Sequence, residues 1–180
     1  MYLNQDGRVK QTTASPGQRR RGPTRFSSVG ELRRAIANLR ARLEPAFAPE
    51  TAMKQSTRAV SASAGQCSAV ATIIRAMLGG ELVSAHVDTQ SHWFNRIPVG
   101  GDLFDIDITG DQFGLPPIQM ARRGKLYGGS RVRRPAEVDK NTRMRAALLA
   151  RRARVGDDLK LGRSLDTFEM AQAVASLRTA

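Results

Sequence analysis

The sequence predicts an α+β fold in which a small antiparallel sheet packs on one helix and further helices lie on both flanks. Three observations lead to this prediction. Apolar side chains recur at helical spacing over residues 67–78, the period changes to two residues from Glu81, and amphipathic helical patterns precede and follow this middle part. A chain of 180 residues is long enough for one such domain with tails.

The first 27 residues are expected to form a disordered basic arm. They contain the run Arg19–Arg21 and almost no apolar side chain after Leu3, so burial cannot repay the entropy of ordering them. The α+β domain is expected to span residues 28–155. A C-terminal helical extension over residues 156–180 is expected to begin at Asp166, where a second capping box precedes an apolar stripe.

The first helix of the domain is predicted from its cap and its stripe. Ser28 and Glu31 form a capping box. Apolar positions then fall on one face, namely Val29, Leu32, Ile36, Leu39 and Leu43. Arginines such as Arg40 are expected to point away from that face. Pro45 is expected to end the helix, and a connecting loop follows to residue 64.

The second helix is predicted to carry the only cysteine of the chain in its first turn. An apolar run at helical spacing begins at Cys67 and stops at Gly79-Gly80. The helix dipole and the free amide donors of a first turn favour a thiolate, which makes Cys67 a candidate nucleophile. The same position also suits an unreactive core cysteine, because free cysteines are among the most buried residues.

Strands are predicted from Leu82, over residues 92–97 and over residues 103–108. With Gly100-Gly101 at the turn, Phe94 pairs with Asp107, and His92 becomes a diagonal neighbour of Asp107 on the same face. His92 is then the candidate base, and Asp107 the acid that orients it. A slip of two residues would put Asp105 in place of Asp107, and a slip of one would turn both acids to the other face.

The segment after residue 113 is expected to be irregular and rich in proline and glycine, and to lead into a basic helix. That helix is expected over residues 141–154, with Met144, Leu148 and Leu149 as its apolar stripe.

Other candidate chemistry is weaker. Gln66 is a candidate oxyanion donor together with the backbone N–H of Cys67, although a glutamine before a helix also serves as a cap. His86 and Asp88 would have to join Cys67 and His92 to hold a metal ion, and no spacing of the CxxC or HExxH type is present. No glycine-rich phosphate motif occurs either. We therefore expect neither a metal nor another cofactor.

Several separated motifs resemble the bacterial YunG-like family in the same order. They are Gly65-Gln66-Cys67-Ser68-Ala69-Val70, Gly79-Gly80-Glu81, Ser91-His92-Trp93-Phe94-Asn95-Arg96 and Asp107-Ile108-Thr109-Gly110-Asp111-Gln112-Phe113. The resemblance spans about residues 65–113. It implies a small cytosolic domain of largely unknown function with a papain-, NlpC- or transglutaminase-like arrangement of its cysteine and histidine.

Charge is distributed unevenly along the chain. The net charge is +13, yet residues 61–120 carry 2 basic and 6 acidic side chains. The arginine-rich flanks therefore predict weak, nonspecific contact with nucleic acid that falls with salt, or merely a solvated surface. A single cysteine, a polar N-terminus and the lack of a long apolar run predict a cytoplasmic protein with no membrane partner.

Two functions follow from these patterns. The leading hypothesis is a cysteine-dependent acyl-transfer enzyme, which hydrolyses, deamidates or transamidates an unknown amide or ester through a thioester at Cys67. The alternative is a non-catalytic binding or regulatory module on the same scaffold, whose arginine-rich flanks contact nucleic acid or an acidic protein.

Overall fold

The computed structural model describes residues 26–53 and 61–155, and the predicted α+β class is confirmed there. A five-stranded antiparallel sheet lies against three α-helices. The helices are α1 (Val29–Leu43), α2 (Cys67–Leu78) and α3 (Lys140–Arg152). The strands are β1 (Glu81–Val87), β2 (Gln90–Val99), β3 (Asp102–Asp107), β4 (Gln119–Arg122) and β5 (Arg131–Arg133). Short 3₁₀ turns include η2 (Pro49–Thr51) and η3 (Gly110–Phe113).

Helix α1 begins and ends where the sequence predicts. The Ser28 hydroxyl accepts a hydrogen bond from the Glu31 backbone N–H at 3.2 Å. The Glu31 carboxylate accepts hydrogen bonds from the backbone N–H and the hydroxyl of Ser27. Pro45 lies in the 3₁₀ turn that follows the helix. The predicted stripe is buried at Leu32, Ile36, Leu39 and Leu43.

The strand order is β4-β3-β2-β1-β5, and the predicted register of the central hairpin is confirmed. Val99 lies opposite Asp102 across the Gly100-Gly101 turn, and Arg96 lies opposite Asp105. The two edge strands were not predicted. Strands β4 and β5 span only four and three residues, too few to produce a readable alternation, and they pair only because β3 and β1 present open edges.

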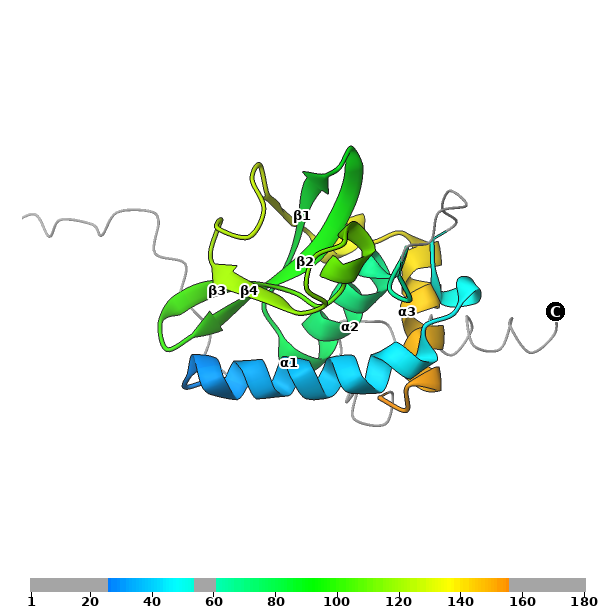
Figure 1. Cartoon of the computed structure of the whole chain (residues 1–180), viewed down its shortest axis with the longest axis horizontal. Coiled ribbons are helices and arrows are strands. Elements are labelled where there is room, and N and C mark those ends of the chain that lie inside the picture. Colours follow the sequence, from blue (N-terminus) through cyan, green and yellow to red (C-terminus); the bar gives the residue numbers. More distant parts are fainter. Residues whose placement is uncertain (1–25, 54–60, 156–180) are drawn as a thin grey trace, which may run out of the picture.

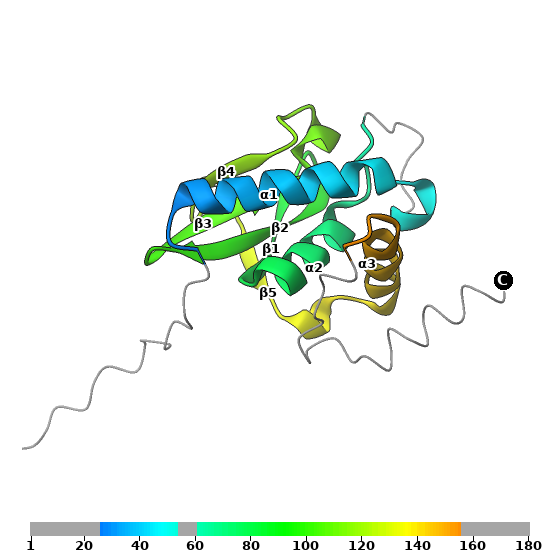
Figure 2. The ribbon, with the colours of Figure 1, turned by 90° about the horizontal axis from the view of Figure 1, so that it is seen from below.

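The helices cover one face of the sheet. Figures 1 and 2 show α1 running across the sheet, α2 beside it and α3 beyond α2. Ile97 and Ile106 share the main hydrophobic core with residues of all three helices. On the other face Leu126 and Tyr127 pack on Phe94. No helix in residues 26–53 or 61–155 is long and apolar enough to cross a bilayer.

Two features differ from the prediction, namely the start of the folded domain and the buried stripe of α3. Phe26, assigned to the N-terminal arm, is buried and forms a bridge with Val99, so it belongs to the core. In α3 only Leu149 of the predicted stripe is fully buried, while Met144 and Leu148 are half-buried. Alanines take their place at Ala146, Ala147 and Ala150, because small side chains let α3 approach α2 closely. The remainder of the N-terminal arm and the helical extension over residues 156–180 lie outside the described residues.

Candidate active site

Cys67 is the first residue of α2, as the sequence predicts. A tight backbone contact places this helix end: the Met53 N–H donates to the Gly65 carbonyl at 2.9 Å. Gly65 has a φ of +73°, and a Cβ there would lie 2.8 Å from the Met53 carbonyl oxygen. Only glycine fits this approach without strain. The loop therefore delivers Cys67 to a fixed position beside the sheet.

Gln66 is buried at the N-cap position of α2, but its side chain makes no capping hydrogen bond. Its Nε2 donates to the Ala48 carbonyl at 3.0 Å, which ties the start of α2 to turn η2. Its Oε1 has no hydrogen-bond partner within the described residues. One hydrogen of the Gln66 side-chain amide thus holds Ala48. The second hydrogen is the one that could donate to an oxyanion at Cys67.

His92 lies at the centre of the predicted constellation. The ring is fully buried, and its Nε2 lies 2.8 Å from Oδ2 of Asp107. The side-chain nitrogen of Gln112 lies 3.2 Å from Nδ1, and the Cys67 thiol lies close enough to the ring to raise the pKa of His92. The structure therefore brings Cys67, His92 and Asp107 together.

The surroundings of His92 favour its charged form. Burial by itself lowers the pKa of an imidazole. Here the hydrogen bond with Asp107, the charge of that carboxylate and the nearby Cys67 thiol outweigh burial and raise the pKa of His92 from 6.5 to about 9. This pKa favours the imidazolium form of His92 at neutral pH, with Nε2 against the Asp107 carboxylate.

Asp107 is held by four hydrogen bonds. Its Oδ1 accepts from the backbone N–H of Thr109 at 2.8 Å and from the Thr109 hydroxyl at 2.9 Å. Its Oδ2 accepts from the Tyr127 hydroxyl at 2.6 Å in addition to His92. Burial and the charge of Asp107 raise the pKa of Tyr127, so the phenol stays protonated as a donor. The carboxylate is therefore fixed in the orientation that pairs with the imidazole.

Asp105, the alternative acid, is engaged elsewhere. Its two oxygens accept from Nε and Nη2 of Arg96 at 2.6 and 3.2 Å, and the Gly124 N–H donates to Oδ2 at 2.6 Å. Arg96 and Asp105 are direct cross-strand partners. This bidentate pair excludes Asp105 from the histidine, so the predicted register with Asp107 holds.

A small cavity opens beside Cys67. Its volume is about 170 Å³, and both apolar and polar side chains line it. They are Met53, Cys67, Ser68, Ser91, Trp93, Val138, Asp139 and Thr142. Cys67 is 4% exposed. The cavity therefore borders Cys67, whereas neither His92 nor Asp107 lines it.

The residues that were candidates for a metal site do not converge in the structure. His86 is exposed on β1, and because Ala85 is the neighbour that pairs with His92, His86 and His92 point to opposite faces. No group of three or more potential metal ligands occurs in residues 26–53 and 61–155.

Three residues of the site carried no assignment in the sequence. Thr109 and Gln112 lie in the stretch that resembles the family, so their position near Asp107 was the only available signal. Tyr127 lies among glycines with no apolar period, twenty residues beyond the carboxylate that it contacts. Only the folding of this loop onto the sheet brings its hydroxyl to Asp107.

Comparison with known proteins identifies one family. No curated protein and no solved structure matches the chain. The family described as "YunG protein" matches residues 35–157, which is more than half of the chain and includes Cys67, His92, Asp107 and Tyr127. The chain therefore belongs to the YunG family.

Proposed function

We propose that this protein is a cysteine-dependent acyl-transfer enzyme that acts on an amide or an ester. Cys67 is the nucleophile, His92 is the general acid and base, and Asp107 orients the imidazole. One observation carries the proposal: the buried ring of His92 lies 2.8 Å from the Asp107 carboxylate and near the Cys67 thiol, and both neighbours raise its pKa, to about 9. A histidine with only a structural role would need no nearby thiol, whereas a catalytic histidine needs a nucleophile such as Cys67 within reach.

The chemistry has two steps. The sulfur attacks the carbonyl carbon while the proton of its thiol rests on His92, and His92 then gives that proton to the leaving amine or alcohol, which leaves a thioester. In hydrolysis a water molecule loses a proton to His92 and attacks the thioester, which releases the acid and restores the thiol. An amine in place of water gives transamidation.

Backbone donors at the start of α2 support this chemistry. The first amide groups of a helix have no partner within it, and they point toward developing negative charge. The N–H of Cys67 is the oxyanion donor in this proposal, and the second amide hydrogen of Gln66 assists it.

The fold proposal extends this arrangement. A cysteine at the N-terminus of a helix, packed on an antiparallel sheet that supplies first a histidine and then an acid, is the chain order of papain- and NlpC-like enzymes. The observed order Cys67, His92, Asp107 and the hairpin register support assigning the chain to that architecture.

Alkylation of the single cysteine tests the function directly. We expect iodoacetamide to modify Cys67 at neutral pH at least about tenfold faster than it modifies a small-molecule thiol, because the imidazolium stabilises the thiolate. The H92A variant should lose this enhancement, and H86A, which removes the exposed histidine, should keep it. Labelling is followed by mass spectrometry.

A contrary result favours the binding module. If wild-type Cys67 reacts no faster than the small-molecule thiol, and H92A changes nothing, the enzyme hypothesis fails. Contact of the arginine-rich flanks with nucleic acid would then be the remaining hypothesis. Titration with a labelled duplex tests it, with an affinity that falls by a log–log slope of about −0.9 per phosphate neutralised as salt rises.

A further inference from the structure

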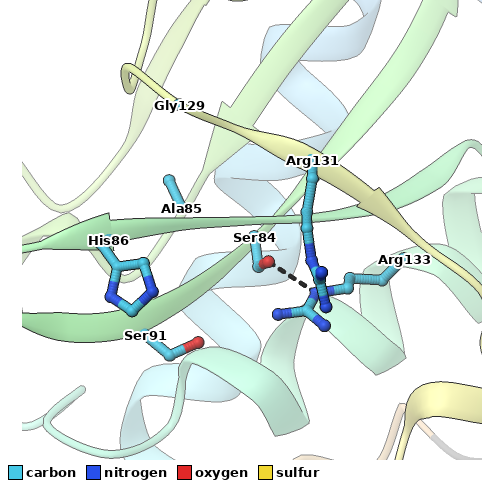
Figure 3. A pocket seen from close by; sticks show the side chains of 7 residues that line it. All are labelled: Ser84, Ala85, His86, Ser91, Gly129, Arg131 and Arg133. Atoms are coloured by element: carbon cyan, nitrogen blue, oxygen red, sulfur yellow. Dashed lines mark hydrogen bonds between the residues drawn. The ribbon is translucent and has the colours of Figure 1, made fainter.

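A second cavity adjoins the cavity at Cys67, on the face of the sheet that carries α2 and opposite to the face from which His92 and Asp107 project. Its volume is about 280 Å³, larger than the cavity at Cys67. The polar side chains that line it are Ser84, His86, Ser91, Arg131 and Arg133. Figure 3 shows the guanidinium groups of Arg131 and Arg133 next to each other on the side of the sheet where Ser84, His86 and Ser91 also point.

The strand register explains why these side chains converge. Arg131 pairs with Ser84, Arg133 pairs with Leu82, and Ser91 pairs with His86. Paired residues and residues two apart point to the same face. One face of the β2-β1-β5 edge thus gathers donors from three strands.

The local charge leaves this cavity electropositive. One carboxylate, that of Glu137, faces three guanidinium groups: it lies 3.1 Å from Arg133, 3.4 Å from Arg134 and 3.6 Å from Arg131. A single negative charge cannot neutralise three positive ones. Arg133 is also held in place, because its Nε donates to the Ser84 hydroxyl at 2.7 Å.

The two cavities are neighbours. Ser91 lines both of them. Trp93 lines the cavity at Cys67, and the guanidinium carbon of Arg133 lies 5.4 Å from the centre of its ring. Strand β5 is two strands away from β2, which corresponds to about 10 Å across a sheet. A molecule of about that length therefore spans from β2, which borders both cavities, to the arginines of β5.

We infer that the cavity of Arg131 and Arg133 binds an oxyanion, a carboxylate or a phosphate, carried by the acyl substrate of Cys67. Planar guanidinium groups bind such anions with paired hydrogen bonds, and the Ser91 hydroxyl provides a further donor at the junction of the two cavities. The substrate class rests on the proposed function. The anion site itself does not.

Anion binding is measured through Trp93, the only tryptophan of the chain. Inorganic phosphate and, separately, suberate are titrated into the full-length protein, with chloride at equal ionic strength as the reference. Because Arg133 lies over the indole ring, we expect a saturable change in fluorescence. Amide NMR shifts of residues 131–133 give a second readout.

Two variants distinguish binding in this cavity from nonspecific attraction of anions to a positively charged surface. R131Q removes a lining guanidinium that is 64% exposed, and we expect it to weaken binding about tenfold. R134Q is the matched control, since Arg134 also contacts Glu137 and is 86% exposed, but it does not line the cavity. An equal loss in both variants, or no saturable signal by fluorescence and NMR, overturns the site.

Matched esters test the substrate class. The mono-p-nitrophenyl ester of suberic acid and the p-nitrophenyl ester of octanoic acid share one carbon chain and differ in the terminal carboxylate. We expect wild type to prefer the charged ester in kcat/KM and R131Q to lose about tenfold of that preference. An unchanged preference in R131Q overturns the substrate assignment. If oxyanions bind but Cys67 alkylates at an ordinary rate, the anion site stands and the acyl-transfer function falls.

Discussion

His92 joins the chemistry of the site to the stability of the fold. Its ring is fully buried, so the proton that it carries is bound more tightly in the folded chain than in the unfolded one. Below about pH 6.5 both states hold the proton and the stabilisation is complete. As the pH rises from there through about 9, the unfolded state loses the proton first, and the stabilisation is lost.

The first prediction at this scale is therefore alkaline destabilisation. Between about pH 6 and about pH 10 the wild-type free energy of unfolding should fall by up to about 3 kcal/mol more than that of H92Q. Urea denaturation at a series of pH values measures the difference. If the free energy of unfolding depended on pH in the same way in wild type and in H92Q, the raised pKa of His92 would be contradicted.

Asp107 should be the main source of that raised pKa. In D107N the carboxylate charge is gone while the size of the side chain is kept, so burial of His92 is no longer balanced. We expect the pKa of His92 to fall well below 9, as measured by NMR titration of the ring carbon resonances. D102N is the control, because Asp102 belongs to the same strand but pairs with the exposed Arg122. If the pKa of His92 were the same in D107N and D102N, Asp107 would not be the source of the raised value.

At the scale of elements, the turn from α2 to β1 depends on two glycines with different demands. Gly79 and Gly80 have φ values of +81° and +82°. A Cβ on Gly79 meets nothing within 4 Å, whereas a Cβ on Gly80 would lie 2.4 Å from the Arg96 carbonyl oxygen. The close approach of this turn to β2 thus requires glycine at the second position for steric reasons as well as conformational ones.

Alanine substitutions separate the two demands. G79A should cost about 1–3 kcal/mol, the strain of a side chain in that backbone region. G80A should cost clearly more, because β2 or the turn must move to admit the methyl group. Urea denaturation of both variants tests the difference, and a G80A protein as stable as G79A would show that the turn adapts freely.

At the scale of the whole molecule, Arg40 connects three distant parts of the chain. Although the sequence directs it away from the apolar stripe of α1, it is only 4% exposed. Its guanidinium donates to both oxygens of Asp111 at 3.0 and 3.2 Å and to the Ile108 carbonyl. The Ser63 hydroxyl, just before α2, donates to Asp111 at 2.6 Å. Helix α1, the segment after β3 and the loop that leads to Cys67 are thereby joined.

Removing this guanidinium should destabilise the whole fold. R40L leaves the Asp111 carboxylate without its cation, and we expect a loss of about 2–4 kcal/mol in the free energy of unfolding. The cost stays below that of a fully buried pair, because Asp111 is 17% exposed. R34L on the exposed side of α1 should change it by less than about 0.5 kcal/mol. Chemical denaturation compares the two, and similar values would contradict a connecting role for Arg40.

Local patterns in the sequence were sufficient for much of the site. The cap at Ser28, the helix that begins at Cys67 and the Gly100-Gly101 turn depend on interactions between residues close in the chain, so they can be predicted from spacing. The turn also fixes the register of β2 and β3, and that register alone places Asp107 near His92 and pairs Asp105 with Arg96.

Other features depend on contacts between residues far apart in the chain, which no periodic pattern encodes. Strands β4 and β5 form only against edges supplied by other strands, and Tyr127 reaches Asp107 only because a glycine-rich loop folds over the sheet. Arg40 is buried because Asp111 lies 71 residues away in sequence but 3.0 Å away in space. The sequence by itself determined the helix, the hairpin and the candidate site residues that they carry. Tertiary packing decided which carboxylates, phenol and guanidinium groups surround them, because burial and pairing depend on three-dimensional proximity.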